Sequence, residues 1–355
     1  MQEFDSIAPG RLCLFGEHQD YLGLPVIAVA LPLCCKIQVC PLEGSKRLKL
    51  EFDGELWSVD LDNLPPKQIP KDGDQLDFAL AAVHEALKDG WIFACGANCV
   101  STTELPLQAG CSSSSAFCVA WVQVLAKLCH KALTRLELAQ MAHRAEVLHF
   151  GSPGGTMDHM TSALGGVLRI GPGMWEQTPL PIPADAQWIL AYSGEPKDTL
   201  KHLRRCKTDR LNLLDKLGGS WDNNNNVVLT TEEKILLEAT RTNRDMEQRA
   251  FASWGCASGQ DLGGWMMKHH EALRDGLKLS TPRLESMREA AMTAGAWGFK
   301  VVGSGGGGCA VAWAPGGTMT DKIVTALTSV GATRVWTIRQ AHDGARCTDH
   351  SNNPS

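Results

Sequence analysis

A glycine turn followed by four serines precedes a long apolar segment of this chain. The turn lies at residues 110–115, and apolar residues continue to residue 130. This pattern predicts a buried helix whose first backbone amides have no partner within the helix. Those amides and the positive end of the helix dipole favour an anion. Ordinary serine capping explains only one or two of the four hydroxyls, so the segment favours an anion site at the start of the helix.

A second glycine cluster, residues 303–308, formally fits the dinucleotide pattern G-x-G-x-x-G. That pattern should open a helix, whereas residues 309–313 continue as a strand, so a dinucleotide fold is poorly supported. A glycine loop between strands can bring backbone close to a ligand, and a tight hairpin without a ligand fits the segment equally well. The sequence contains no G-x-x-x-x-G-K-[ST], which excludes a Walker-type NTPase.

Charged groups stand amid apolar or glycine-rich sequence in two further segments, residues 8–21 and 151–159. In the first of them, Glu17, His18 and Asp20 follow a strand-like apolar run. They are poor structural choices there unless they bind something polar, and a hydroxyl-rich ligand suits them. Taken singly, each is more often a solvated loop residue.

Composition limits the class of protein. The 355 residues are 44% hydrophobic and 21% charged, enough for a large core and two domains, and the net charge of -5 has the wrong sign for a nucleic-acid partner. The chain lacks a signal-like start, and its most apolar stretch, residues 24–35, is too short to span a membrane. The 13 cysteines include no C-x-x-C pair. We therefore expect buried thiols in a soluble, cytoplasmic protein rather than zinc ligands or disulfides.

Hydrophobic periodicity predicts strands and helices mixed along the chain. Asp53-Gly54 between strand-like runs predicts a hairpin, and Thr134 with Glu137 predicts a capping box. The predicted strands are 24–40, 48–61, 189–193 and the two flanks of the glycine cluster within 299–314, and the predicted helices are 75–88, 112–130, 134–149 and a helical region over 231–294. A proline-rich passage over 172–183 suggests domains at 1–180 and 181–345, followed by a loose polar tail at 346–355.

Four segments, in this order along the chain, together resemble the GHMP small-molecule kinase superfamily. The amino-acid sequence of the first segment most resembles the galactokinase branch of that superfamily. The first motif is matched by Pro9-Gly10-Arg11 and Gly16-Glu-His-Gln-Asp-Tyr21, and the phosphate loop by residues 110–116. The third match is Met157-Asp158-His159 with the preceding Glu146, and the fourth is the loop at residues 303–309. The resemblance implies an α+β, two-domain fold with mixed sheets, helices packed on one face and an active site between the domains.

The resemblance also implies ATP-dependent phosphorylation of a monosaccharide, with galactose at its anomeric hydroxyl as the main expectation. Asp158 would be the general base, with Arg11 beside it. The remaining implied roles form three groups: sugar contacts by Glu17, His18, Asp20, Tyr21 and Gly305; ATP phosphate contacts by Gly110, Cys111, Ser112, Ser113, Ser114 and Ser115; and Mg²⁺ ligation by Ser114 and Glu146. The expected partners are the sugar and ATP, with no nucleic acid or membrane, in a monomer or weak homo-oligomer.

Several positions depart from the family pattern. Cys111 replaces a leucine and Ser115 an alanine, which leaves the metal-binding serine open among Ser113, Ser114 and Ser115. Gly306 replaces a phenylalanine, and residues 193–206 lack the tyrosine that galactokinases place at the sugar. A uronate, arabinose, an amino sugar or a mevalonate-like alcohol therefore stays open as the acceptor. A sugar-binding and ATP-binding regulator without turnover is the alternative outside the enzymes.

Overall fold

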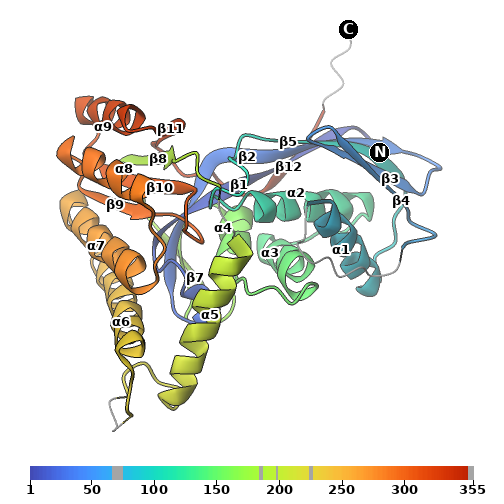
Figure 1. Ribbon diagram of the computed structural model, residues 1–355. Helices are drawn as coiled ribbons and strands as arrows, with labels where there is room; N and C mark the ends of the chain where they lie inside the picture. The colour runs from blue at the N-terminus through green and yellow to red at the C-terminus, as the bar shows by residue number, and fades with distance from the viewer. Residues whose placement is uncertain (66–74, 184–186, 197–198, 224–226, 351–355) are drawn as a thin grey trace.

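The computed structural model describes residues 1–65, 75–183, 187–196, 199–223 and 227–350. Within these ranges two β-sheets lie side by side, each accompanied by helices (Figure 1). In chain order the elements are β1 (Phe4–Phe15), η1 (Asp20–Leu22), β2 (Val26–Leu42), β3 (Arg47–Phe52), β4 (Glu55–Asp60), α1 (Gln75–Lys88), β5 (Gly96–Thr103), α2 (Ser113–Leu128), α3 (Arg135–His143), η2 (Arg144–Leu148), α4 (Met157–Leu164), β6 (Val167–Ile170), β7 (Gln177–Leu180), β8 (Gln187–Tyr192), α5 (Thr199–Lys216), α6 (Thr231–Ala252), α7 (Gly259–Glu271), η3 (Ala272–Gly276), α8 (Pro282–Thr293), β9 (Gly298–Val301), β10 (Cys309–Ala314), α9 (Thr318–Ser329), β11 (Arg334–Ile338) and β12 (Arg346–Asp349).

The first sheet has the order β12-β1-β2-β5-β3-β4, with β6 and β7 added beside β2. Its strand pairs are antiparallel except β3 with β5, so the sheet is mixed. Helices α1 to α4 pack on one face of it (Figure 1). The hairpin predicted at Asp53-Gly54 is confirmed: both residues have positive φ, which an Asp-Gly turn tolerates at little cost.

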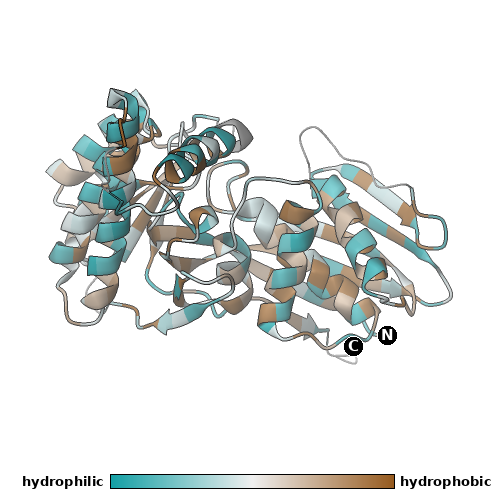
Figure 2. Ribbon diagram, turned by 90° about the horizontal axis from the view of Figure 1, so that it is seen from below, coloured by the Kyte–Doolittle hydropathy of each residue, from teal (hydrophilic) through white to brown (hydrophobic). Residues whose placement is uncertain are grey.

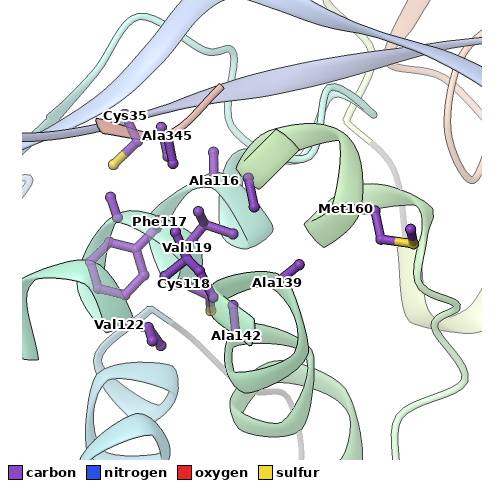
Figure 3. Packing of buried hydrophobic residues seen from close by; sticks show 14 of the residues in the cluster. Cys35, Ala116, Phe117, Cys118, Val119, Val122, Ala139, Ala142, Met160 and Ala345 are labelled. Atoms are coloured by element: carbon purple, nitrogen blue, oxygen red, sulfur yellow. The ribbon is translucent and has the colours of Figure 1, made fainter. Parts of the chain in front are cut away.

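Helix α2 lies at the centre of the larger hydrophobic core. From Ser115 to Leu128 nearly every side chain is buried, as its apolar sequence predicted. Cys118 of α2 lies next to Ala142 of α3 (Figure 3). Phe117 contacts Phe52 of β3, with ring centroids 6.3 Å apart. This burial fixes the start of α2, and therefore the serine turn, relative to the first sheet.

The second sheet has the order β11-β8-β10-β9 and is covered on both faces. Alternate residues of β8 enter two different cores: Ile189 packs with α8 and α9, whereas Trp188 belongs to the larger core that contains Phe15. The larger core therefore reaches from the first sheet to the second. The α+β architecture is confirmed. The first sheet is mixed as expected, whereas the strand pairs of the second sheet are all antiparallel. The division at residue 180 stays a prediction.

Most of the predicted elements are confirmed, with two differences. The helix expected over residues 134–149 begins with the predicted capping box of Thr134 and Glu137, but after His143 it continues as one π-helical turn, η2. The expectation of a loose tail is wrong for Arg346–Asp349, because β12 pairs antiparallel with β1. An edge strand needs backbone partners rather than apolar side chains, so its polar sequence gave no signal.

Most helices carry polar and apolar residues together, as Figure 2 shows from below. Such helices bury one face and expose the other. Among the described residues, none of the helices has the length and apolar character that crossing a bilayer requires.

Candidate active site

Arg11 and Asp158 form a bidentate ion pair between β1 and the first turn of α4. Arg11 Nε and Nη2 donate to the two carboxylate oxygens of Asp158 at 2.7 and 3.0 Å, and Nη1 donates to the carbonyl of Gly110. The fork geometry of a guanidinium suits this arrangement. Burial alone would raise the pKa of Asp158, but Arg11 and Ser112, with a smaller contribution from His159, together lower it below its usual value. The carboxylate is therefore ionised at neutral pH.

The serine turn approaches β1 because Gly10 has no side chain. A Cβ at Gly10 would lie 2.5 Å from the carbonyl oxygen of Cys111, and the amide of Arg11 donates to that oxygen at 3.1 Å. Ser112 is the N-cap residue of α2, with φ of 62° and no side-chain capping bond. Its hydroxyl lies beside Asp158 instead. Ordinary capping by Ser112 is thus excluded, and the open end of α2 lies beside the carboxylate of Asp158.

Glu146 lies on the π-helical turn η2, a feature that frequently marks functional sites. Its carboxylate is 2.6 Å from Nε2 of His159, and the hydroxyls of Ser114 and Ser115 lie beside it. Burial would raise the pKa of Glu146, but His159 and the two serines lower it below its usual value. A carboxylate with neighbouring hydroxyls is a donor set that fits Mg²⁺.

Asp20 lies opposite the ion pair, in η1. Its carboxylate fits against Gly155, where a Cβ would be 2.0 Å from Oδ2, and it accepts from the amide of Met157 at 3.3 Å. Burial raises the pKa of Asp20 to about 6, and the nearby Asp158 carboxylate adds to the rise. The first and third sequence segments therefore meet at two acidic side chains with opposite pKa shifts.

The glycine loop of residues 303–308 joins β9 to β10 and docks against the serine turn. The amide of Cys309 donates to the carbonyl of Ala109 at 2.8 Å. Gly306 has φ of 73°, and a Cβ there would lie 2.2 Å from Nε2 of His202 on α5, so the glycine makes room for this histidine. The nearest neighbours of Gly305 belong to Leu279, so its expected contact with the acceptor stays a prediction.

The first motif is held by residues that the sequence reasoning missed. Glu17 pairs with Lys300, and Asn243 donates to the carbonyl of Glu17 at 2.8 Å. Arg210 donates to the carbonyl of His18 and to the Tyr21 hydroxyl. A lysine within the apolar strand β9 was the one sequence signal for these partners. Asp20 of the same motif lies near Asp158.

The structure therefore brings Arg11, Asp20, Asp158 and the serine turn together, with Glu146 beside the serines. The predicted phosphate contacts are contiguous: Gly110 and Cys111 form a bend, Ser112 is the N-cap residue, and residues 113–115 begin α2. Cys111 is buried. The roles of these residues toward ATP, metal and acceptor remain predictions, because geometry alone fixes their positions and not their ligands.

Comparison with known proteins identifies the family. The model for "GHMP kinases N terminal domain" matches residues 77–166, "GHMP kinases C terminal" matches residues 252–333, and "Galactokinase galactose-binding signature" matches residues 2–41. Mevalonate kinase of Pyrococcus abyssi is 30% identical over 96% of each chain. Galactokinase of Haemophilus influenzae is 27% identical, over 89% of this chain and 86% of its own.

Solved structures share the fold. Lactococcus lactis galactokinase complexed with galactose has a TM-score of 0.85 at 19% identity and covers 97% of this chain and 95% of its own. The Methanococcus jannaschii mevalonate kinase has a TM-score of 0.74 at 18% identity, covering 95% and 98%. GHMP kinases are phosphotransferases that use ATP as co-substrate. On the sequence matches and the fold together, this chain belongs to the GHMP kinase family.

Proposed function

We propose that this kinase transfers the γ-phosphoryl group of ATP to the anomeric hydroxyl of a monosaccharide, with galactose as the first candidate, giving galactose 1-phosphate and ADP. One observation carries the proposal: the ionised carboxylate of Asp158, fixed by Arg11, lies at the open end of α2. A fixed base beside an anion-binding turn is what phosphoryl transfer to a hydroxyl requires.

The chemistry divides between positioning and charge. The amides at the start of α2 would bind the triphosphate. Asp158 would then accept the acceptor's hydroxyl proton at a carboxylate oxygen. The hydroxyl oxygen attacks the γ-phosphorus at the same time, and the O–P bond to ADP breaks. Arg11 contacts both Asp158 and the Gly110 carbonyl. Its positive charge therefore lies beside the proposed base and beside the turn that would bind the phosphates. Electrostatic stabilisation of this kind is usually the largest catalytic contribution.

Glu146 and Ser114 would hold Mg²⁺, with Ser115 as the alternative hydroxyl. When bound, the ion would neutralise charge on the β- and γ-phosphates. His159 contacts Glu146 at 2.6 Å and would orient that carboxylate. Ser113 becomes the weakest of the three serine candidates, because Ser114 and Ser115 are the hydroxyls beside Glu146.

Two observations bear on the acceptor and favour different classes. The galactose-binding signature and the half-buried carboxylate of Asp20 support a sugar, since a carboxylate recognises hydroxyl groups. The 30% identity to a mevalonate kinase over nearly the whole chain supports mevalonate as the second candidate.

An ADP-release assay over a panel of acceptors tests the proposal. The panel contains galactose, arabinose, galacturonate, an amino sugar and mevalonate, each with ATP and Mg²⁺. We expect turnover with galactose above all others. Turnover with mevalonate alone would overturn the sugar assignment, and binding of galactose and ATP without ADP release would indicate a regulator.

A further inference from the structure

Three rings connect the β6–β7 hairpin to the carboxylate of Glu146. The ring centroids of Trp175 and His143 lie 5.4 Å apart, and those of His143 and His159 lie 5.2 Å apart. Both pairs meet edge to face, at interplanar angles of 86° and 88° respectively, an arrangement that aromatic rings prefer. His159 then contacts Glu146, with its Nε2 2.6 Å from Oε2. Each step from the hairpin to Glu146 is therefore a direct contact between side chains.

The two histidines are nearly closed to solvent. His143 is 4% exposed and His159 is 1% exposed. Among the described residues, Nδ1 of each ring has no hydrogen-bond partner. The one hydrogen bond of this histidine pair is the bond between Nε2 of His159 and Glu146, again within the described part of the chain. Packing against neighbouring rings, rather than hydrogen bonding, therefore places His143.

Trp175 is held in an unfavourable backbone conformation. Its φ is 71°, in the left-handed region that a bulky residue rarely adopts. Glu176 fixes the loop around it: its amide donates to the carbonyl of Gly173, its carboxylate accepts from the amide of Gly173, and its carbonyl accepts from the amide of Gly171. Strain of this kind persists where the surroundings impose it, and it is concentrated at functional sites. The hairpin thus presents the indole ring to His143 in spite of backbone strain.

We propose that Trp175 and His143 are positioning residues for the metal site. They hold the ring of His159, so that its Nε2 keeps the Glu146 carboxylate oriented for the metal ion. Groups that hydrogen-bond to a ligating carboxylate, or that fix such groups, tune metal affinity without touching the metal. This inference rests on the proposed function, which assigns Mg²⁺ to Glu146 and a neighbouring serine. The β6–β7 hairpin then contributes to metal affinity although it carries no metal ligand.

Mn²⁺ binding to the ADP complex tests the proposal without turnover, because Mn²⁺ takes the same oxygen donors as Mg²⁺ and enhances the relaxation of water protons. We expect His159→Leu to weaken the Mn²⁺ affinity by roughly tenfold or more, since Glu146 loses its hydrogen-bond donor. Trp175→Ala and His143→Ala should each weaken it by roughly threefold to tenfold, because the ring of His159 is then less well fixed.

Matched variants keep the contact in question. Trp175→Phe and His143→Phe keep a ring, and His159→Gln keeps an N–H donor, so each should stay within about twofold of the unaltered protein. Met174→Ala, at a 74% exposed position next to Trp175, controls for damage to the hairpin. It should leave the Mn²⁺ affinity unchanged.

Turnover gives a second measurement, with whichever panel compound the unaltered protein phosphorylates. In Trp175→Ala the Mg²⁺ concentration for half-maximal turnover should rise by the same factor as the Mn²⁺ dissociation constant. The acceptor KM, and kcat at saturating Mg²⁺, should change by less than about twofold. Failure of galactose as the acceptor would overturn only the proposed function, since Mn²⁺ binding is measured without an acceptor.

A double-mutant cycle separates positioning from general damage to the fold. Once His159→Leu has removed the bond to Glu146, Trp175→Ala should weaken the Mn²⁺ affinity no further. An equal loss from Trp175→Ala in both backgrounds would overturn the proposal, and so would an unchanged Mn²⁺ affinity in Trp175→Ala and His143→Ala. Should His159→Leu fail to fold, the Mn²⁺ affinities of Trp175→Ala and Trp175→Phe decide, because equal values would show that the ring at residue 175 is not needed.

Discussion

Asp158 and Asp20 lie close enough to repel each other, yet their pKa values move in opposite directions. Burial pushes both upward. Asp158 has the Arg11 guanidinium on both of its oxygens, which brings its pKa below 3.8, whereas Asp20 accepts weaker bonds from backbone amides and its pKa rises to about 6. The partner, rather than the depth of burial, decides the charge of each group.

This difference separates two tasks within one site. Environments that shift the pKa values of two titratable groups in opposite directions allow each group to take a different role. Asp158 is ionised at neutral pH, the state in which a carboxylate can accept a proton. Asp20 can gain a proton near pH 6, so its affinity for a hydroxyl group depends on pH. The predictions below test whether the two carboxylates are distinct in this way.

The largest effect is expected from Asp158→Asn. The amide keeps the shape of the side chain but cannot accept the proton, so kcat should fall by roughly 10²-fold or more. Acceptor and ATP affinities, measured by calorimetry, should stay nearly unchanged. A variant that retains full turnover would show that the reaction needs no base and would move the catalytic role to Arg11.

A smaller loss is expected from Arg11→Lys. Lysine keeps the positive charge but loses the bidentate contact with Asp158, so kcat should fall by roughly tenfold. The pKa of Asp158 should rise toward its ordinary value, and the acid limb of the kcat profile should move to higher pH. An unchanged pH profile with the same kcat loss would mean that Arg11 acts on the phosphate alone and not through Asp158.

Much of the site could be predicted from the sequence because its parts are local. The serine turn, the Asp53-Gly54 hairpin and the capping box at Thr134 each depend on neighbouring residues, and all three lie where the sequence placed them. Arg11 and Asp158 were paired only through the family resemblance. Nothing in their spacing along the chain indicates a contact.

The remaining features depend on how distant segments pack. Lys300 reaches Glu17 across 283 positions, and Arg210 reaches Tyr21 across 189. Such contacts follow from the docking of the second sheet against β1, which no local pattern encodes. The sequence did not predict strand β12 for a related reason, because its partner strand β1 lies at the other end of the chain.

A moderate effect is expected from Asp20→Asn on acceptor binding. Ionised Asp20 would accept a hydrogen bond from the acceptor, so the variant should raise the acceptor KM by roughly tenfold at pH 8 with a smaller change in kcat. In the unaltered protein kcat/KM should decline as pH falls through about 6, and this limb should be absent from the variant. A limb that persists in Asp20→Asn would assign the titration to another group.

The smallest effect concerns stability, where the two carboxylates should act with opposite sign. The pKa of Asp20 is higher in the folded protein than its ordinary 3.8, so the folded state binds the proton more tightly and the free energy of unfolding falls as pH rises from about 4 to 6. Asparagine cannot ionise. Asp20→Asn should therefore be more stable than the unaltered protein at pH 7. The gain in the free energy of unfolding should be on the order of 1 kcal/mol, because solvent screens this partly exposed group. The gain should vanish near pH 4.

Asp158 supplies the contrast, because its pKa is lowered by folding. Its ionisation stabilises the protein above its ordinary pKa, and that contribution is lost as pH falls through the folded value. Urea unfolding at pH 4 to 8 should therefore give an Asp158→Asn variant that is less stable at pH 7, the reverse of Asp20→Asn. If both variants lost stability equally at pH 7, repulsion between the two carboxylates would be too weak to separate their roles, and the pH-dependent affinity assigned to Asp20 would lose its physical basis.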